Sequence, residues 1–359
     1  MLAYILAGGT GTRFWPMSRQ QRPKQLVRLW GDETMIETTA HRLAEPAQED
    51  GVFVVCGPDL VDPISGTLTD FPREQFVIEP MARDTAPAIA LAAIQTLERA
   101  GDVPFGVFPA DHYIGDDDAF RRCLAAAESA ADAGHIVTIG IEPSRPETGY
   151  GYIHYDDGDG ADSGDAPSVH SVEAFVEKPD RKRAKRYLES GEYLWNAGMF
   201  VMKPSTLLDE MERQLPEMYE GFLRIRDAWR TEAHDEVLRE EFEAMEGISI
   251  DYGVMEDARD VVCVPADFTW SDVGHWAALD EVRDTDENDN VIEADAILEN
   301  VENSVIFSED SDRLIAGIDL DDMVVVDTQN AVLVLPKSSA QKVRDIVHRL
   351  RESGRDDVL

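Results

Sequence analysis

Short apolar runs alternate with amphipathic stretches along the first half of the chain. Several of these runs have the length and composition of buried strands: residues 2–7, 52–56, 75–80, 103–111 and 135–143. The stretches between them that have helical spacing are residues 34–45, 86–100 and 118–134. Strands that alternate with helices predict an α/β fold with a Rossmann-like, mixed but mainly parallel sheet, covered by helices on both faces.

The middle of the chain extends the predicted sheet and then becomes helical. Residues 148–155 and 168–179 are predicted strands on either side of an insert, residues 156–167. The Gly, Asp and Ser residues of that insert indicate a solvated loop. A further strand is predicted at residues 199–203, and residues 204–247 have a helical pattern.

The pattern changes again after about Asp284, where residues 284–290 have the composition of a linker. Short β-type segments separated by turn residues then follow, at residues 303–310, 313–318, 323–328 and 331–336. A final helix is predicted over residues 338–353. We therefore predict two domains, a larger one over residues 1–284 and a small β-rich one over residues 285–359.

The net charge is the most unusual feature of the composition. The 359 residues include 33 basic and 72 acidic side chains, which gives a formal charge of −39. A nucleic acid or an anionic membrane would be repelled by this charge. Our hypothesis is that the acidity keeps the protein hydrated in a salt-rich cytosol, where screening removes most of the self-repulsion, as in halophilic proteins.

Other features of the sequence point to the cytoplasm. No apolar run approaches the roughly 20 residues that a membrane span needs. The first apolar run enters a glycine loop directly, which favours a buried strand over a signal peptide. The cysteines lie far apart and form no metal-binding pattern, so we expect small buried hydrophobic side chains: Cys56, Cys123 and Cys263.

The segment that follows the first predicted strand combines glycines with basic residues. Gly8, Gly9 and Gly11 leave the backbone open to close approach by a ligand. Arg13 and Lys24, two of five basic residues within sixteen positions and with no acidic residue among them, can supply charge for phosphate oxygens. The glycines alone would also fit a tight turn, but together with the basic residues they predict a phosphate site.

Three common phosphate-binding motifs do not fit this loop. A P-loop would need a lysine within GxxxxGK[ST], and a dinucleotide fingerprint would need a third glycine in GxGxxG. A kinase would need a catalytic HRD sequence, which the chain does not contain. The loop therefore belongs to another class of phosphate-binding protein.

The segment AGGTGTRFWPMSRQQRPKQL resembles the signature loop of the sugar-1-phosphate nucleotidyltransferases. Within that family, Trp15-Pro16 and Lys24-Gln25 resemble the mannose-1-phosphate guanylyltransferase branch. The resemblance covers nearly the whole chain and continues, in family order, through EPMARDTAPAIA, FPADHYI, TGYGYI, VEKP, WNAGMF, SIDYGVME and TWSDVG. It implies a GT-A-like nucleotidyltransferase domain followed by a short left-handed β-helix.

The resemblance also implies which residues contact the nucleotide and the metal. A Mg²⁺ ion would be held by Asp111 and Asp272, although Asp111 alone would equally fit a turn or a helix cap. The implied nucleotide-binding residues are Leu6, Ala7, Gly8, Gly9, Gly11, Thr12, Arg13, Lys24, Arg83, Thr85 and Asp111. Asp84 stands where the family usually has Asn, which leaves its role open. His112 has no partner motif and is expected to be a packed or hydrogen-bonded side chain.

A second set of residues is implied to bind the sugar phosphate: Gly149, Tyr150, Glu177, Lys178 and Asn196. The alternative for Glu177 and Lys178 is a surface ion pair, and the alternative for the loop around Tyr150 is an exposed aromatic hairpin. Lysine suits a phosphate, and the carboxylate and amide suit sugar hydroxyls. Arg13, Lys24 and Lys178 are the implied catalytic residues.

The resemblance implies guanylyl transfer from GTP to α-D-mannose 1-phosphate, with GDP-mannose and pyrophosphate as products. One alternative is the same chemistry with UTP or dTTP and glucose 1-phosphate. Another is a regulatory subunit that binds a nucleotide sugar without turnover, although the basic and acidic residues of the site are all retained. A homodimer that pairs through the C-terminal domain is expected by analogy with the family.

Overall fold

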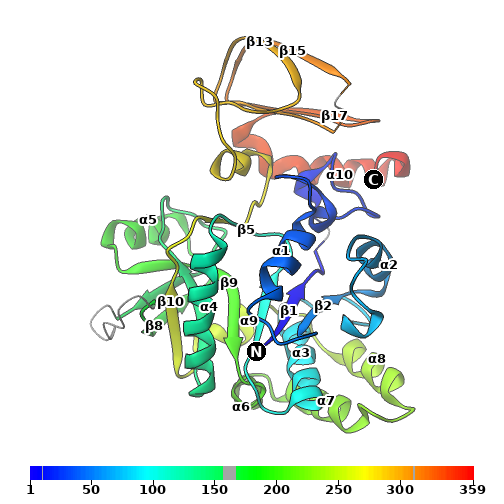
Figure 1. Ribbon diagram of the computed structural model, residues 1–359, viewed down its shortest axis with the longest axis vertical. Helices are drawn as coiled ribbons and strands as arrows, with labels where there is room; N and C mark the ends of the chain where they lie inside the picture. The colour runs from blue at the N-terminus through cyan, green and yellow to red at the C-terminus, as the bar shows by residue number, and fades with distance from the viewer. Residues whose placement is uncertain (10, 157–166, 310–311) are drawn as a thin grey trace.

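The computed structural model describes residues 1–9, 11–156, 167–309 and 312–359. The predicted loop at residues 156–167 therefore lies almost entirely outside the described residues. Figure 1 shows an elongated molecule in which a large α/β body carries a small β-rich unit at one end, with helix α10 (Val343–Glu352) between the two. No helix in the described part of the chain is both long and apolar enough to cross a bilayer.

One nine-stranded sheet forms the centre of the body. Its strand order is β3-β2-β1-β4-β9-β6-β10-β8-β7. The bounds, in that order, are Phe76–Ile78, Val52–Cys56, Leu2–Leu6, Phe105–Pro109, Tyr193–Met202, Ile136–Ile141, Val261–Pro265, His170–Val176 and Tyr152–Tyr155. Strands β8 and β9 run against the others. The predicted mixed, mainly parallel α/β sheet is thus confirmed.

Helices cover both faces of this sheet, because side chains alternate between the faces along each strand. In β1, Ala3 and Ile5 join one apolar cluster, while Leu2 and Tyr4 join the other. The first face is covered by α1 (Met35–Ala44), α2 (Pro58–Thr67), α4 (Asp117–Asp132) and α5 (Arg181–Ser190). The second is covered by α3 (Thr85–Ala100), α6 (Pro204–Gln214), α7 (Pro216–Ala228), α8 (His234–Ala244) and α9 (Ile250–Gly253).

The C-terminal unit has two small sheets, in which the strands pair in parallel except for β17, which is antiparallel to β16. One sheet has the order β12-β14-β16-β17, and the other pairs β13 with β15. Their bounds are Val291–Glu293, Val305–Ser308, Met323–Asp327, Val332–Pro336, Asp295–Glu302 and Leu314–Asp321. The alternation of the chain between the two sheets is the arrangement of a short β-helix, and the prediction of a β-rich unit is confirmed. Strands β12 and β13 had no counterpart among the predicted segments.

A third apolar cluster joins the two units. It contains Phe14, Trp15 and Met17 from the loop after β1, together with Val343 and Val347 of α10. The indole N–H of Trp15 donates to the carbonyl of Val358 at 2.8 Å, and that of Trp276 donates to the carbonyl of Trp15 at 3.0 Å. The C-terminal unit therefore packs directly against the segment that carries the predicted phosphate loop.

Candidate active site

The predicted loop lies at the carboxyl edge of the central sheet. Strands β1 and β4 are parallel neighbours, with Leu6 paired to Pro109, so the loop after β1 lies beside Asp111 after β4. The loop is followed by two 3-10 turns, Thr12–Phe14 and Lys24–Leu26, and the first α-helix begins only at Met35. Exposed backbone in the loop, and not the N-terminus of a long helix, is therefore what a phosphate would meet there.

The glycines of the loop occupy two different kinds of position. Gly11 has a φ of 58°, and a Cβ there would lie 2.1 Å from Cβ of Lys24. Only glycine fits that position, because the two backbone segments touch. A Cβ at Gly8 or Gly9 would meet no described atom within 4 Å. Those two positions border open space, as expected where a ligand approaches the backbone.

Lys24 links the two predicted metal carboxylates. Its Nζ lies 2.8 Å from Oδ2 of Asp111, and it also donates to the backbone carbonyls of Asp111 at 3.2 Å and Asp272 at 2.8 Å. The lysine is only 5% exposed. Residues 24, 111 and 272 therefore meet at one point, although they are distant in the sequence.

The two aspartates are held in polar surroundings. Burial by itself would raise the pKa of Asp111, but the charges of Lys24, His112 and Arg13 hold the pKa below its usual value. Oδ1 of Asp272 accepts hydrogen bonds from the Tyr150 hydroxyl at 2.6 Å and from the Gly274 N–H at 3.1 Å. Both side chains are thus suited to act as oxygen ligands for a divalent cation.

A Mg²⁺ site of this kind needs few protein ligands. No group of three or more His, Cys, Asp or Glu side chains with metal-binding geometry occurs among the residues that the structure describes. Mg²⁺ often binds through one or two carboxylates, with substrate phosphates and waters completing its shell. The pair Asp111 and Asp272, next to an open glycine loop, fits that donor set.

A cavity of about 460 Å³ lies beside the loop. Among the predicted nucleotide-binding residues it is lined by Leu6, Gly8, Gly9, Arg83 and Thr85. Thr12, by contrast, lines a separate small pocket together with Trp15 and Arg19. Ala7 is buried, and its carbonyl accepts a hydrogen bond from Nε2 of Gln25 at 2.9 Å. This contact explains why a glutamine follows Lys24 in the sequence.

The segment from Arg83 to Thr85 is fixed largely by contacts with α8 and α9. The guanidinium of Arg83 donates to the carbonyls of Phe242 at 2.7 Å and Glu243 at 3.0 Å, at the end of α8. The Thr85 hydroxyl accepts the Ile250 N–H at 2.9 Å. Asp84 caps α3 and has a φ of 66°, so it has a backbone role. In this arrangement the charged group of Arg83 is engaged by the end of α8.

Glu79 is a site residue to which the sequence analysis gave no role. It follows β3, lines the same cavity and is only 6% exposed. Its Oε1 has no hydrogen-bond partner in the described part of the chain. Burial raises the pKa of its carboxyl to about 7. Its position directly after a buried strand was the available sequence signal, but the burial itself could not be read from the sequence.

His112 is hydrogen-bonded, as predicted. Its Nδ1 accepts from the Trp270 indole at 3.3 Å, and burial lowers its pKa. It lines the cavity of about 460 Å³ together with Gly198. An imidazole that is hydrogen-bonded to Trp270 is therefore part of the cavity wall next to Asp111.

The predicted sugar-binding residues gather around Glu177. Its Oε1 lies 2.7 Å from Nζ of Lys178, whose side chain is half exposed, while Glu177 itself is buried. A Cβ on Gly151 would lie 2.6 Å from Oε2 of Glu177, so the strand after Tyr150 packs closely on this carboxylate. Gly149 is exposed, and its N–H donates to Oε1 of Glu147 at 2.9 Å.

Asn196 connects this group to a second residue that the sequence analysis missed. Its Oδ1 accepts from Thr138 and from the Gly198 N–H, and its Nδ2 donates to Oδ1 of Asp251 at 2.9 Å. Burial, followed by the nearby charge of Glu177, raises the pKa of Asp251 to about 6. Asp251 lies in the quoted segment SIDYGVME, but only the fold brings it to Asn196.

The basic residues of the opening segment divide between two tasks. Arg13 donates to Oε1 of Gln341 at 3.2 Å, and its charge also acts on Asp111. Arg19 donates to Oδ1 of Asn330 at 2.7 Å and to the carbonyl of Val358, and Arg22 pairs with Glu309. Arg19 and Arg22, to which the sequence analysis gave no individual role, therefore bind the C-terminal unit.

Comparisons with known proteins cover the whole chain. The Nucleotidyl transferase family matches residues 2–289, and the MannoseP isomerase/GMP-like beta-helix domain matches residues 294–350. A mannose-1-phosphate guanylyltransferase of Klebsiella pneumoniae is 39% identical over 360 residues, which are 99% of this chain and 75% of that protein. A putative mannose-1-phosphate guanylyltransferase of Vibrio cholerae is 40% identical over 98% of this chain and 74% of its own length.

A solved structure gives the same result for the fold. The crystal structure of a protein from Thermus thermophilus, described as a mannose-1-phosphate geranyltransferase, superposes with a TM-score of 0.88 at 35% identity. The superposition covers 98% of this chain and 99% of that one. The same family is indicated by both parts of the fold, by the order of the motifs and by the sequence identity over nearly the full length. The chain belongs to the mannose-1-phosphate guanylyltransferase family, in which a nucleotidyltransferase domain is followed by a β-helix.

Proposed function

We propose that this chain transfers GMP from GTP to α-D-mannose 1-phosphate and releases pyrophosphate. The observation that carries the proposal is the meeting of Lys24, Asp111 and Asp272 beside the open glycine loop. The printed activity of the Klebsiella relative supports the choice of substrates. The site supplies positive charge and can position the phosphates for a phosphoryl-type transfer. Such a transfer needs no covalent nucleophile from the protein.

In the proposed step, an oxygen of the sugar phosphate attacks the α-phosphorus of GTP in line. A new bond forms between that oxygen and the α-phosphorus, and the bond from the α-phosphorus to the bridging oxygen of the β-phosphate breaks. The electron pair leaves with pyrophosphate, which Arg13 would hold. Lys24 would neutralise charge at the α-phosphate, and Lys178 would position the attacking phosphate.

Asp111 and Asp272 would hold Mg²⁺, whose positive charge, when bound, would neutralise phosphate oxygens of both substrates. Lys24 already binds both segments, so it fixes the distance between them before any ligand arrives. The Tyr150 hydroxyl holds one oxygen of Asp272 and leaves the other available. The carboxylates are therefore preorganised.

Glu79 supports the choice of guanine. The Watson–Crick edge of guanine presents two adjacent donors, N1–H and N2–H, which match the two oxygens of a carboxylate. Uracil and thymine present one N–H between two carbonyl oxygens, which a carboxylate would repel. The cavity of about 460 Å³ beside the glycine loop would hold the base, and we call it the nucleotide cavity. An unpaired acceptor at its wall thus favours GTP over UTP and dTTP.

The test of the proposed function is pyrophosphate release with Mg²⁺ in high KCl. GTP, UTP, dTTP and ATP are each combined with mannose 1-phosphate and glucose 1-phosphate. Highest activity with GTP and mannose 1-phosphate is the expected result. A maximum with another pair would overturn the substrate assignment, and nucleotide binding without any turnover would favour the regulatory subunit.

Two expectations about the whole protein are also proposals. We place the domain boundary near Asp284, because β10 of the large sheet ends at Pro265 and β12 of the small unit begins at Val291. We propose a cytoplasmic homodimer that pairs through the C-terminal unit, where Ile297, Ile318, Val332 and Val334 are exposed. Sedimentation at micromolar concentration checks the dimer, and a monomer would contradict it.

A further inference from the structure

A cavity of about 590 Å³ lies away from the candidate active site. It is enclosed by the turn between α6 and α7, the end of α8 and residues 246–248. Its volume is in the range of small-molecule sites. None of its lining residues has a role in the proposed reaction, so its presence needs another explanation.

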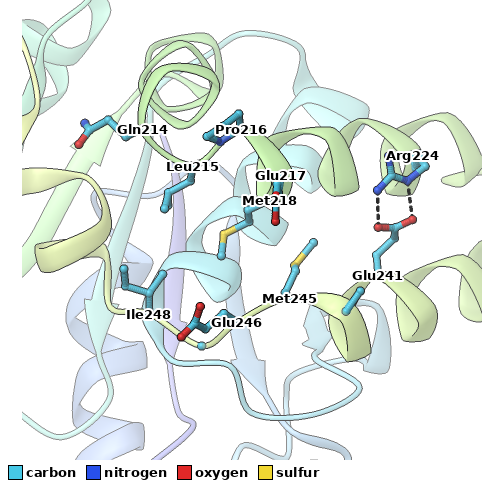
Figure 2. A pocket seen from close by; sticks show the side chains of 12 residues that line it. Gln214, Leu215, Pro216, Glu217, Met218, Arg224, Glu241, Met245, Glu246 and Ile248 are labelled. Atoms are coloured by element: carbon cyan, nitrogen blue, oxygen red, sulfur yellow. Dashed lines mark hydrogen bonds and ion pairs between the residues drawn. The ribbon is translucent and has the colours of Figure 1, made fainter.

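The walls of this cavity, which we call the α7–α8 cavity, are apolar in the middle. Leu215, Met218, Met245 and Ile248 provide the apolar surface. Figure 2 shows Met218 and Met245 extending into the space from opposite walls. Methionine side chains adapt to ligands of different shapes, so this part of the cavity can accept an apolar body.

The charges of the cavity are mainly negative. Arg224 is engaged by Glu241 through two hydrogen bonds of 2.5 and 2.8 Å (Figure 2). Glu217 and Glu246 also line the cavity, and within the described chain neither makes a side-chain hydrogen bond or ion pair. Helices α6 and α8 end at the cavity and α7 begins there, so the partial negative charges of two helix C-termini outweigh the partial positive charge of one N-terminus. A positively charged group would therefore be favoured.

The α7–α8 cavity and the nucleotide cavity share a wall. Ile248, which lines the first, donates its N–H to the carbonyl of Arg83 at 3.2 Å and accepts the N–H of Ala86 at 3.1 Å. A Cβ on Gly247 would lie 3.3 Å from the backbone of Arg83. Because Arg83 and Thr85 line the nucleotide cavity, a displacement of residues 246–248 is transmitted to its wall.

The end of α8 reinforces this connection. The Arg83 guanidinium binds the carbonyls of Phe242 and Glu243, one turn before Met245. A ligand that contacts Met245 and Glu246 would thus act on both attachments of the nucleotide-binding segment. Binding sites that share such a segment influence each other's affinity, and the coupling is reciprocal.

We propose that the α7–α8 cavity is an effector site for an amphipathic organic cation and that its occupancy changes the affinity for GTP through residues 246–248. The apolar body of the ligand lies between Met218 and Met245, and its ammonium group lies near Glu217 and Glu246. The binding half of this proposal is independent of the proposed reaction. The coupling half rests on GTP binding, which is measured separately.

The test uses tryptamine as the probe and the full-length protein in molar KCl, so that non-specific attraction to the acidic surface is screened. Calorimetry measures tryptamine binding, with the neutral alcohol tryptophol and the anion indole-3-propionate as controls. The expected result is saturable binding of tryptamine at one site, with weaker binding of both controls. The GTP dissociation constant should change by about fivefold or more when tryptamine is saturating.

Matched variants test whether tryptamine binds in the α7–α8 cavity. The double variant Glu217→Gln/Glu246→Gln should weaken tryptamine by about tenfold, roughly 1.4 kcal/mol, and leave GTP binding without tryptamine unchanged. Glu220→Gln/Glu243→Gln removes two exposed charges from the same helices outside the cavity and should bind tryptamine normally. Ala244→Trp, at an exposed lining position, should block the site without disturbing the core.

Three results would overturn the proposal. Equal tryptamine affinity in the two double variants would remove the site from this cavity. An unchanged GTP dissociation constant with tryptamine bound would remove the coupling. Absence of GTP binding in the untreated protein would instead refute the proposed function, and the coupling with it, whereas tryptamine binding would still decide whether the site exists.

Discussion

The ammonium nitrogen of Lys24 lies 2.8 Å from Oδ2 of Asp111. The same nitrogen donates to the backbone carbonyl of Asp272, so one side chain fixes the strand ends that carry both predicted metal ligands. In the absence of substrate, the carboxylate of Asp111 and the lysine satisfy each other. When a triphosphate enters, the lysine already lies next to the place where positive charge is needed to neutralise the phosphate.

Replacing Lys24 should therefore affect turnover more than binding. We expect Lys24→Ala to reduce kcat by about 100-fold or more, equivalent to ~2.7 kcal/mol of barrier. Steady-state pyrophosphate release measures the change, and Arg28→Ala is the control, because Arg28 is an exposed basic residue of the same segment. A Lys24→Ala enzyme with near-normal kcat would exclude the lysine from the mechanism.

Glu79 should make GTP binding depend on pH. Burial raises the pKa of this carboxyl to about 7, so it loses its proton as the pH rises from 6 to 8. Because the ionised form accepts the two donors of guanine, GTP affinity should increase over that interval. Calorimetry of GTP and UTP separates this effect from titration of the triphosphate, which both nucleotides share. Glu79→Gln should abolish the difference, and a persistent difference would contradict the assignment.

The same group should also influence stability. The pKa of Glu79 in the folded protein lies above the ordinary value of 4.5, so the folded state binds the proton more tightly. The stability that this proton provides is full below pH 4.5 and is lost as the pH rises through about 7. The free energy of unfolding of the wild type should therefore fall relative to that of Glu79→Gln across this range. Urea denaturation at several pH values measures the two curves, and parallel curves would refute the prediction.

Lys178 should act on the sugar phosphate and not on the nucleotide. Its side chain is half exposed and pairs with the buried Glu177, so Lys178→Ala leaves that carboxylate without this partner and its stability has to be measured together with its kinetics. We expect Lys178→Ala to raise the KM for mannose 1-phosphate by about tenfold, roughly 1.4 kcal/mol, with little change in the KM for GTP. Lys182→Ala, at an exposed position in the next helix, is the matched control. Equal effects on both KM values would argue against this role.

The packing of α10 on the opening segment should be necessary for activity. Val347 is 5% exposed and joins the cluster that contains Phe14 and Trp15, whereas its neighbour Ile346 is 38% exposed. Val347→Asp would bury an unpaired charge and should destabilise the protein by about 3 kcal/mol or more. Ile346→Asp should change stability by about 0.5 kcal/mol or less. Denaturant unfolding and kcat, measured together, check both, and equal losses would contradict this view of the interface.

Salt should stabilise the whole protein. With a formal charge of −39, self-repulsion is large and is reduced by screening. We expect the melting temperature to rise as KCl is added. Sucrose at matched osmolality controls for effects that do not involve charge. A melting temperature that does not rise with KCl would exclude the salt-adaptation hypothesis.

The sequence by itself determined the secondary structure of most of the body and the order of the functional segments. Apolar periodicity is local, so it predicted strands such as β2 and helices such as α3 close to their actual bounds. The glycine loop was predicted as a phosphate site from its own residues, whereas Asp111 and Asp272 were predicted as metal ligands only through the resemblance to the family. In contrast, β12 and β13 have too few apolar residues in alternation to be predicted.

Only the tertiary structure decided which of these residues act together. Lys24 and Asp272 are far apart in the sequence, and their contact depends on how β1 and β11 (Trp270–Ser271) are placed. The burial of Glu79 and Asp251, and hence their raised pKa values, comes from neighbours on other elements. The contacts of Arg19 and Arg22 with the C-terminal unit were not predicted for the same reason. Charge and periodicity are local properties, whereas burial and contact are set by packing between distant segments.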